Sequence, residues 1–275
     1  MKPAVSVCIP TMNSERTLRA TIDSVLAQDF VDYEIVVSDN ASDDSTIEIA
    51  ESFGDDRIRI ERHTERVCLA DNWHRGVLAA HGDLVKLLCS DDLIAPTCLS
   101  VQTPLMTDPE VALVASRYDV VDDDDEVLAR DLGLAGFDGR HEPCDAMRAF
   151  VRGTPDVLFP TAAVLFRRDD YVQTRGFRDE FVYTLDFAAW LDITARGALI
   201  VCPEPLAGSR ASAFNVSSST STWRKARDVM GFNRWAYRVH GGAAGPIRRR
   251  DEVSGDLVVL QSLVHRLYLR ATGTR

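Results

Sequence analysis

Short apolar runs alternate with amphipathic segments along the first hundred residues. A strand covered on both faces is apolar at nearly every position, whereas a surface helix repeats its apolar residues every three or four positions. Residues 84–88 fit the first description, and residues 5–9, 34–38 and 57–60 are the other predicted strands. The segments between them fit the second, so the pattern predicts β-α-β units around a mostly parallel sheet.

Polar residues and a glycine set the expected ends of the intervening helices. We expect Asn13 or Ser14 to cap the first helix and Ser42 or Asp43 to cap the second, because such side chains accept hydrogen bonds from the first free N–H groups. The third helix is expected to end at Gly82, since glycine readily adopts the left-handed conformation that closes many helices.

The second half of the chain is less regular. The elements predicted there are strands at residues 111–116 and 161–167, and helices that begin near Pro96 and span residues 186–195 and 257–270. Residues 133–153 hold four glycines and predict a loop with a short helix. Residues 122–126 are five consecutive acids between two short apolar segments, which favours a solvated hairpin turn over a metal site.

Length and composition restrict the class of protein. The chain has 275 residues, 45% of them hydrophobic, which is enough for a substantial core. No window approaches the roughly 18 uninterrupted apolar residues of a membrane-spanning helix, and the first ten residues lack the pattern of a signal peptide. We therefore expect a cytoplasmic chain. Six cysteines are scattered without the close pairs that zinc sites use.

Charge is distributed unevenly. The net charge of −11 disfavours binding to nucleic acid without regard to sequence. Residues 223–250 nevertheless hold eight basic residues and one acid, Asp228, so this stretch carries +7 and the rest of the chain −18. Three interpretations stay open for the basic stretch: it covers an acceptor site, it contacts acidic lipid headgroups at a membrane, or it solvates an edge of the domain.

Polar segments follow three of the predicted strands, at residues 10–13, 39–44 and 89–92. Ligands of open α/β sheets collect at these carboxyl ends. Adjacent carboxylates such as Asp91 and Asp92 can hold Mg²⁺ or Mn²⁺ on phosphate oxygens, although they can equally cap the helix that follows. A capping role does not account for Asp39, and this favours a ligand site.

Three segments, VSVCIPTMN at residues 5–13, EIVVSDNASD at 34–43 and LLCSDD at 87–92, resemble the successive signatures of the family 2 glycosyltransferases. The resemblance covers about residues 4–210 and implies the GT-A fold. It implies a catalytic domain over residues 1–210, with a nucleotide-sugar-binding half at 1–95 and an acceptor-side half at 96–210, and a helical C-terminal extension at 211–275. Members transfer a sugar from a nucleoside diphosphate to a hydroxyl with inversion, usually with Mg²⁺ or Mn²⁺.

The resemblance also implies roles for individual residues. Those placed at the donor are Pro10, Thr11, Asn13, Asp39, Asn40, Asp71, Asp91 and Arg210. Asp39 would accept a hydrogen bond from the base, typically uracil or thymine. Asp71 stands where the family often has an arginine that helps hold the donor, so a charge is reversed close to the diphosphate.

Metal binding is implied at Asp92, with Asp91 beside it. Many members complete the metal shell with a histidine after the catalytic helix, and Ser212 stands at the matching position. A hydroxyl replaces imidazole poorly for Mn²⁺, whereas Mg²⁺ accepts water there. Arg210 precedes it by two residues and can take up diphosphate charge through bidentate hydrogen bonds.

The general base is implied at Asp186, which matches the aspartate of a conserved acidic pair, while Leu185 replaces the other acid. An inverting transfer needs one carboxylate to take the acceptor proton, so one aspartate is sufficient. Asp186 taken alone is better explained as a first-turn helix residue that interacts with the macrodipole, and the other motifs shift the preference to the base.

Two other functions compete with this interpretation. A sugar-nucleotide nucleotidyltransferase needs a glycine-rich loop after the first strand, and residues 10–15 contain no glycine. The other alternative is a non-catalytic relative that binds a nucleotide sugar or a carbohydrate. It is suggested by Ser212, Leu185 and Asp71, where the chain departs from the family pattern. The expected acceptor is a glycan, lipid-linked or small-molecule hydroxyl, and a homodimer and peripheral membrane contact through residues 223–250 remain alternatives.

Overall fold

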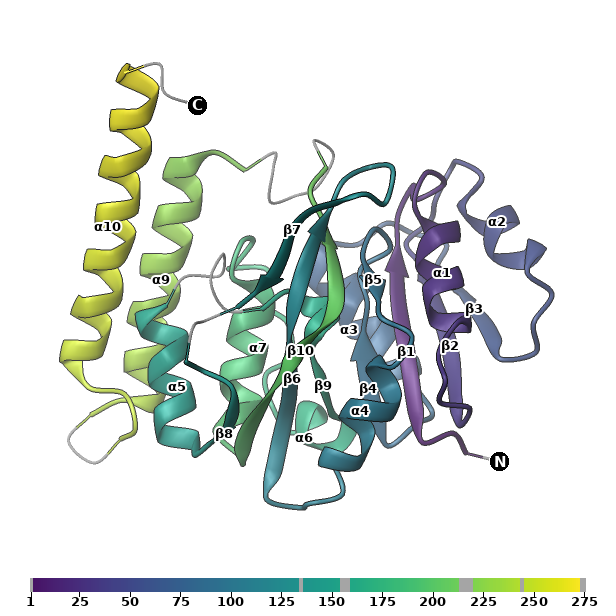
Figure 1. Ribbon diagram of the computed structural model, residues 1–275, viewed down its shortest axis with the longest axis horizontal. Coiled ribbons are helices and arrows are strands. Elements are labelled where there is room, and N and C mark those ends of the chain that lie inside the picture. The colour runs from purple at the N-terminus through teal and green to yellow at the C-terminus, as the bar shows by residue number, and fades with distance from the viewer. Residues whose placement is uncertain (1, 134–135, 154–158, 213–219, 243–244, 273–275) are drawn as a thin grey trace.

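The computed structural model describes residues 2–133, 136–153, 159–212, 220–242 and 245–272, and these form an α/β fold in which helices flank a ten-stranded sheet (Figure 1). The strands are β1 (Val5–Thr11), β2 (Tyr33–Asp39), β3 (Ile58–Arg62), β4 (Leu84–Leu87), β5 (Leu93–Ile94), β6 (Val111–Val121), β7 (Val127–Leu132), β8 (Gly139–His141), β9 (Leu165–Arg167) and β10 (Ala198–Arg210). The helices are α1 (Leu18–Leu26), α2 (Thr46–Ser52), α3 (Leu69–Ala79), α4 (Cys98–Leu105), α5 (Pro143–Arg152), α6 (Arg168–Val172), α7 (Leu185–Thr194), α9 (Thr222–His240) and α10 (Arg249–Thr272), with a 3-10 turn, η2, at Thr161–Ala163.

The strand order is β3-β2-β1-β4-β9-β6-β10-β5, with β7 added to β6 and β8 to β10. Strands β1 to β4 pair in parallel, as do β6 and β10, while β9 runs antiparallel between the two groups. The predicted α/β fold with a helical C-terminal part is therefore confirmed, and the sheet is mixed. In the parallel β1–β2 pair Thr11 lies opposite Asp39, so the ends of these two strands meet.

Helices cover both faces of the sheet: α1 and α4 lie in front of it in Figure 1, and α3 and α6 behind it. Helices α5, α9 and α10 stack beyond the β8 side, with α10 outermost. No helix in the described ranges is both long enough and apolar enough to cross a membrane. The divisions expected after residues 95 and 210 stay predictions.

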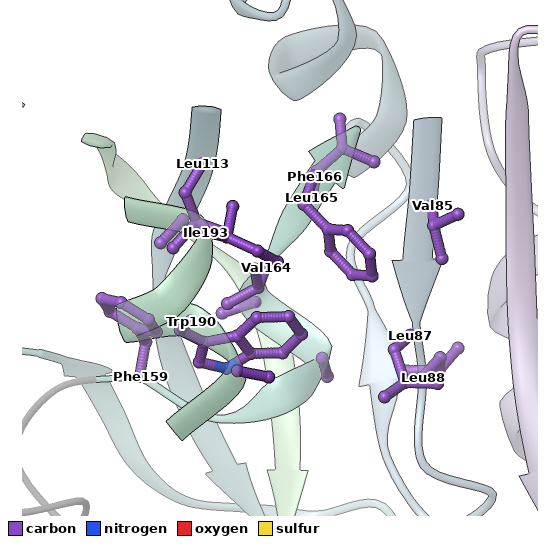
Figure 2. Packing of buried hydrophobic residues seen from close by; sticks show 14 of the residues in the cluster. Val85, Leu87, Leu88, Leu113, Phe159, Val164, Leu165, Phe166, Trp190 and Ile193 are labelled. Carbon is purple, nitrogen blue, oxygen red and sulfur yellow. The ribbon is translucent and has the colours of Figure 1, made fainter. Parts of the chain in front are cut away.

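Helix α7 is fixed to the sheet by Trp190. Its ring is fully buried and lies 5.1 Å from the ring of Phe166 on β9. Figure 2 shows the indole among Leu113 of β6, Val164 of the segment before β9, and Phe166 of β9. Truncation of a buried tryptophan costs about 3–5 kcal/mol, so this packing holds the N-terminus of α7 in a defined position.

Several local predictions were wrong. Residues 161–163 form a 3-10 turn, and only residues 165–167 of the predicted strand pair with β4 and β6. Helix α1 starts at Leu18 and α2 at Thr46, each later than the expected caps. Asn13 and Ser42 instead join the two loops, because the Asn13 N–H donates to Ser42 Oγ at 2.9 Å.

Gly82 is needed for space and has no positive φ. A Cβ atom at this position would lie 2.8 Å from the backbone nitrogen of Ser6, closer than real contacts allow. The turn therefore requires glycine because two backbones meet there, and the expected left-handed helix stop was wrong.

Candidate active site

The ends of β1 and β2 hold a buried carboxylate. Thr11 Oγ1 donates to Asp39 Oδ1 at 3.0 Å, and Ser42 donates its N–H to Oδ2 at 3.0 Å and its hydroxyl to Oδ1 at 2.5 Å. A carboxylate accepts about four hydrogen bonds. Three come from the residues that the structure describes, so among these residues one acceptor position on Asp39 is left for a ligand.

The loops after these strands are shaped by two asparagines. Asn13 has a φ of 53°, and its Oδ1 accepts the N–H of Asp43 at 3.0 Å. Asn40 is buried and exchanges two hydrogen bonds with the backbone of Val67, at 3.0 and 2.8 Å. Pro10 lies within β1, opposite Ser38. These side-chain amides hold the loops around Asp39, next to the expected nucleoside position.

Helix α3 brings Asn72 to the end of β1. Asp71 is exposed in its first turn, and no hydrogen bond to another candidate residue is found within the described ranges. Its neighbour Asn72 is buried and donates to the carbonyl of Thr11 at 3.3 Å. Asn72 Oδ1 is a buried acceptor without a partner among the described atoms. Asn72 was not among the predicted site residues, whereas the adjacent Asp71 was.

Asp91 and Asp92 lie between β4 and β5, in a loop that is tied to the one after β1. The hydroxyls of Ser90 and Ser14 share a hydrogen bond of 2.8 Å, and Thr17 Oγ1 donates to the carbonyl of Ser90 at 2.7 Å. Ligand atoms of Cys89, Asp91 and Asp92 lie within 4.8 Å of one another. The acidic pair is thereby fixed beside the loops that surround Asp39.

Burial and mutual repulsion act on this acidic pair. Burial raises the pKa of Asp92 well above its usual value, and the charge of Asp91 adds to the effect, while the Arg210 N–H, which donates to Asp92 Oδ1 at 2.9 Å, opposes it. Burial also raises the pKa of Asp91, with Arg210 opposing. Two desolvated carboxylates this close favour a cation between or beside them.

Arg210 is engaged within the protein. Its guanidinium donates to the carbonyl of Asp91 at 2.7 Å, to the carbonyl of Asp122 and to the carboxylate of Asp125. The predicted acidic hairpin turn between β6 and β7 is confirmed, but Arg210 and Arg16, which lies 3.8 Å from Asp123, hold it against the site. The Arg210 guanidinium is therefore already bound to two backbone carbonyls and to the Asp125 carboxylate, next to Asp91.

Asp186 lies in the first turn of α7, beside the acidic pair. Its Oδ2 accepts the hydroxyl of Thr161 at 3.0 Å and its Oδ1 accepts the N–H of Phe187 at 2.9 Å. Burial raises its pKa to about 6, against these two hydrogen bonds. The pKa of Cys89 is raised by burial and then by Asp92, Asp91 and Asp186, while a hydrogen bond with Thr161 opposes the shift. Thr161 and Cys89 thus connect Asp186 with Asp91 and Asp92.

Asp228 in α9 fixes the segment that leads into α7. Its carboxylate accepts the N–H groups of Val182 (3.3 Å), Tyr183 (2.8 Å) and Thr184 (2.9 Å), and the Thr184 hydroxyl (3.1 Å). These hydrogen bonds fix the backbone directly ahead of the helix that carries Asp186. Asp228 was not among the predicted site residues and stood out in the sequence only as the single acid of the basic stretch. Ser212, the expected substitute for a metal ligand, is buried just after β10.

Comparisons with known proteins bear on the family and the fold. The family described as Glycosyl transferase family 2 matches residues 6–173. The UDP-Glc:alpha-D-GlcNAc-diphosphoundecaprenol beta-1,3-glucosyltransferase of Escherichia coli is 28% identical over 117 residues, which cover 42% of this chain and 46% of that protein. This chain therefore spans less than half of that relative.

Two solved structures share the fold. Staphylococcus aureus TarS, residues 1–349, in complex with UDP-GlcNAc superposes with a TM-score of 0.70 at 18% identity, covering 94% of this chain and 72% of TarS. The mannosyltransferase PcManGT of Pyrobaculum calidifontis, in complex with GDP-Man and Mn²⁺, gives 0.68 at 20% identity, covering 99% of this chain and 80% of that one.

Proposed function

The chain belongs to glycosyl transferase family 2, and from that premise we propose that it transfers a sugar from a uridine or thymidine diphosphate sugar to an acceptor hydroxyl, with inversion at the anomeric carbon. The observation that carries the proposal is the link between two carboxylate sites. Thr161 hydrogen-bonds both Asp186 and Cys89, and Cys89 lies against Asp91 and Asp92. A proton acceptor is thus held beside a diphosphate site.

The acidic pair fits a hard divalent cation. Asp91 and Asp92 offer carboxylate oxygens, which Mg²⁺ and Mn²⁺ prefer, whereas burial raises the pKa of the Cys89 thiol and keeps it protonated and a poor ligand. Asp92, with Asp91 beside it, would hold the cation, which would neutralise charge on the departing diphosphate. The bound Mn²⁺ of PcManGT supports such a site here.

Asp186 is suited to take the acceptor proton. A pKa of about 6 leaves the carboxylate ionised near neutral pH and more basic than an exposed aspartate. In the reaction the acceptor oxygen bonds to the anomeric carbon, the bond from that carbon to the diphosphate oxygen breaks, and the hydroxyl proton moves to Asp186. Thr161 and the Phe187 N–H hold both carboxylate oxygens in place for this transfer.

Donor recognition rests on the ends of β1 and β2. Asp39 keeps one acceptor position, and uracil and thymine each present one ring N–H that can fill it. Asn72 Oδ1 adds a second buried acceptor nearby. TarS binds UDP-GlcNAc, which supports a uridine donor. Asp71 and the engaged Arg210 leave fewer free positive charges for the diphosphate than the family pattern has, so the divalent cation carries more of that neutralisation.

For the acceptor we propose a lipid-linked hydroxyl on the cytoplasmic side of a membrane. The E. coli relative is named for a diphosphoundecaprenol-linked acceptor, which supports this class. Asp186, which would face the acceptor, lies in the part of the fold nearest to α9, because Asp228 of α9 binds the backbone directly before α7.

Release of nucleoside diphosphate, measured over a panel of UDP-, dTDP- and GDP-sugars with Mn²⁺ and then with EDTA, tests the proposal. We expect turnover that EDTA removes and that Asp186→Asn lowers by about 10²–10⁴, while the exposed Asp179→Asn matches the wild type. Stabilisation by a donor without turnover on any acceptor class would favour the non-catalytic binder instead.

A further inference from the structure

Helix α9 carries a stripe of unpaired arginines. Arg224, Arg227, Arg234 and Arg238 are all exposed, and at 3.6 residues per turn they fall within an arc of about 80°. No ion pair to any of the four is found among the residues that the structure describes. Trp223, 65% exposed, lies at the margin of the same arc. We call these five residues the arginine stripe.

Helix α10 carries an apolar stripe. Val253, Leu257, Leu260 and Val264 are exposed, the last by 66%, and their spacing places them within an arc of about 60°. An exposed apolar patch of this kind marks an interaction surface in soluble domains. The residues of α10 that face α9 are different ones, Val259 and Leu263, which pack against Ala226 and Val229.

Both stripes lie on the outer surface of the α9–α10 pair. Most buried residues of α9, such as Phe232 and Ala236, lie on the side opposite the arginine stripe, and Trp235 borders it. On α10 the position that meets α5 is Gly255, where a Cβ would overlap the carbonyl oxygen of Val151. The apolar stripe is turned away from this contact, and Figure 1 shows the two helices side by side at the end of the molecule.

The surface begins close to the candidate base. Trp223 and Arg224 lie in the first turn of α9. Lys225 Nζ sits 4.7 Å from the centre of the Tyr183 ring, and Asp228 binds the backbone of residues 182–184. In the first turns of α9, Lys225 and Asp228 therefore contact the segment that leads into Asp186. The arginine stripe lies on a different side of the same helix.

We propose that the arginine and apolar stripes together dock the protein on a bilayer that contains anionic phospholipids. Arginines attract the phosphate headgroups, and the apolar side chains of α10 and Trp223 enter the boundary between headgroups and acyl chains. Docking there brings the Asp186 side of the site to the membrane, where a lipid-linked hydroxyl is held. The inference concerns binding and does not depend on the identity of the donor.

The chemistry of the surface selects a bilayer over nucleic acid. Nucleic acids are bound through cations spread over a basic surface, whereas this chain has a net charge of −11 and its exposed arginines lie on the helix that packs beside the one carrying the apolar stripe. An anionic bilayer offers both a charged layer and an apolar one. The other partners that the stripe could meet, a second copy or an acidic macromolecule, are outcomes of the test below.

Sedimentation with vesicles tests the inference without substrate. The full chain is mixed with phosphatidylcholine vesicles or with vesicles that also contain phosphatidylglycerol, at low and at high salt. We expect binding to the anionic vesicles alone, weakened by salt, with a blue shift of Trp223 emission. A basic residue near an anionic surface contributes about a factor of five to binding, so Arg227→Gln with Arg234→Gln should weaken it about 25-fold.

A matched control removes the same charge elsewhere. Arg62→Gln with Arg130→Gln changes two exposed arginines on β3 and β7 and should leave vesicle binding within about twofold, as surface changes away from the contact do.

Leu257→Ser with Leu260→Ser should weaken the binding that survives high salt. The inference is overturned if the chain ignores anionic vesicles, if the control pair loses as much binding as the stripe pair, or if light scattering shows that the stripe variants abolish a dimer instead. None of these results bears on turnover in solution, so glycosyl transfer is judged separately.

Discussion

Replacing Asp186 by asparagine should stabilise the protein while it removes the base. Burial raises the pKa of this carboxyl from 3.8 to about 6, and a shift of about two pKa units corresponds to about 3 kcal/mol. The folded chain binds the proton more tightly than the unfolded chain. The ionised carboxylate therefore costs stability progressively as pH rises from about 4 to about 6, and the full cost persists above that range.

Asparagine carries no charge and keeps the contacts. Its oxygen can accept the N–H of Phe187, and its amide can donate to the Thr161 hydroxyl, which rotates to accept. We expect Asp186→Asn to raise the free energy of unfolding by up to about 3 kcal/mol at about pH 8 and to leave it unchanged near pH 4.

Urea denaturation of the metal-free protein at the two pH values measures this difference. Asp179→Asn, an exposed change ahead of the same helix, should stay within about 0.5 kcal/mol of the wild type at both. If Asp186→Asn is no more stable than the wild type at the higher pH, the carboxyl is not desolvated, and the reasoning that makes it a tuned base fails.

Three further predictions concern the acidic pair, Asp228 as the residue that fixes the segment before α7, and Gly82 in the turn before β4. Mn²⁺ at about 100 times its Kd should add about 2.7 kcal/mol to the free energy of unfolding, and Asp92→Asn should abolish this gain in a thermal-shift titration; an unchanged gain would remove Asp92 from the metal site. Asp228→Ala leaves the three backbone N–H groups of residues 182–184 without their acceptor; it should cost about 1–3 kcal/mol and lower kcat with the donor KM unchanged, whereas a rise in KM alone would contradict the role of Asp228 in fixing this segment. Gly82→Ala should cost about 1–3 kcal/mol in urea unfolding, because its Cβ meets the backbone of Ser6; no loss would show that the close approach relaxes freely.

The parts of the fold that sequence periodicity determines were predicted well. Strands β1, β2 and β4 are continuous apolar runs whose ends are polar, and the structure has them within about two residues of the predicted bounds. The segment at residues 161–167 was wrong because a short apolar run cannot distinguish a strand from a buried 3-10 turn. That turn matters, since it supplies the Thr161 hydroxyl to Asp186.

The contacts that sequence reasoning missed join residues far apart in the chain. Asp228 acts on a segment 44 residues earlier, and Arg210 binds a turn 85 residues earlier. Local pattern carries no signal for such pairs. The only available hint was the composition of residues 223–250, where a lone acid stands among eight bases, because an isolated acid in a basic helix needs a reason to be there.

The central claim is that Asp92 binds the metal while Asp186 takes the acceptor proton. Single-turnover transfer with Asp186→Asn, run with Mn²⁺ and a saturating nucleotide sugar, tests this claim most directly. We predict that this variant binds metal and donor as the wild type does, while the rate of sugar transfer falls by at least about 100-fold. A transfer rate equal to that of the wild type would show that another group takes the acceptor proton.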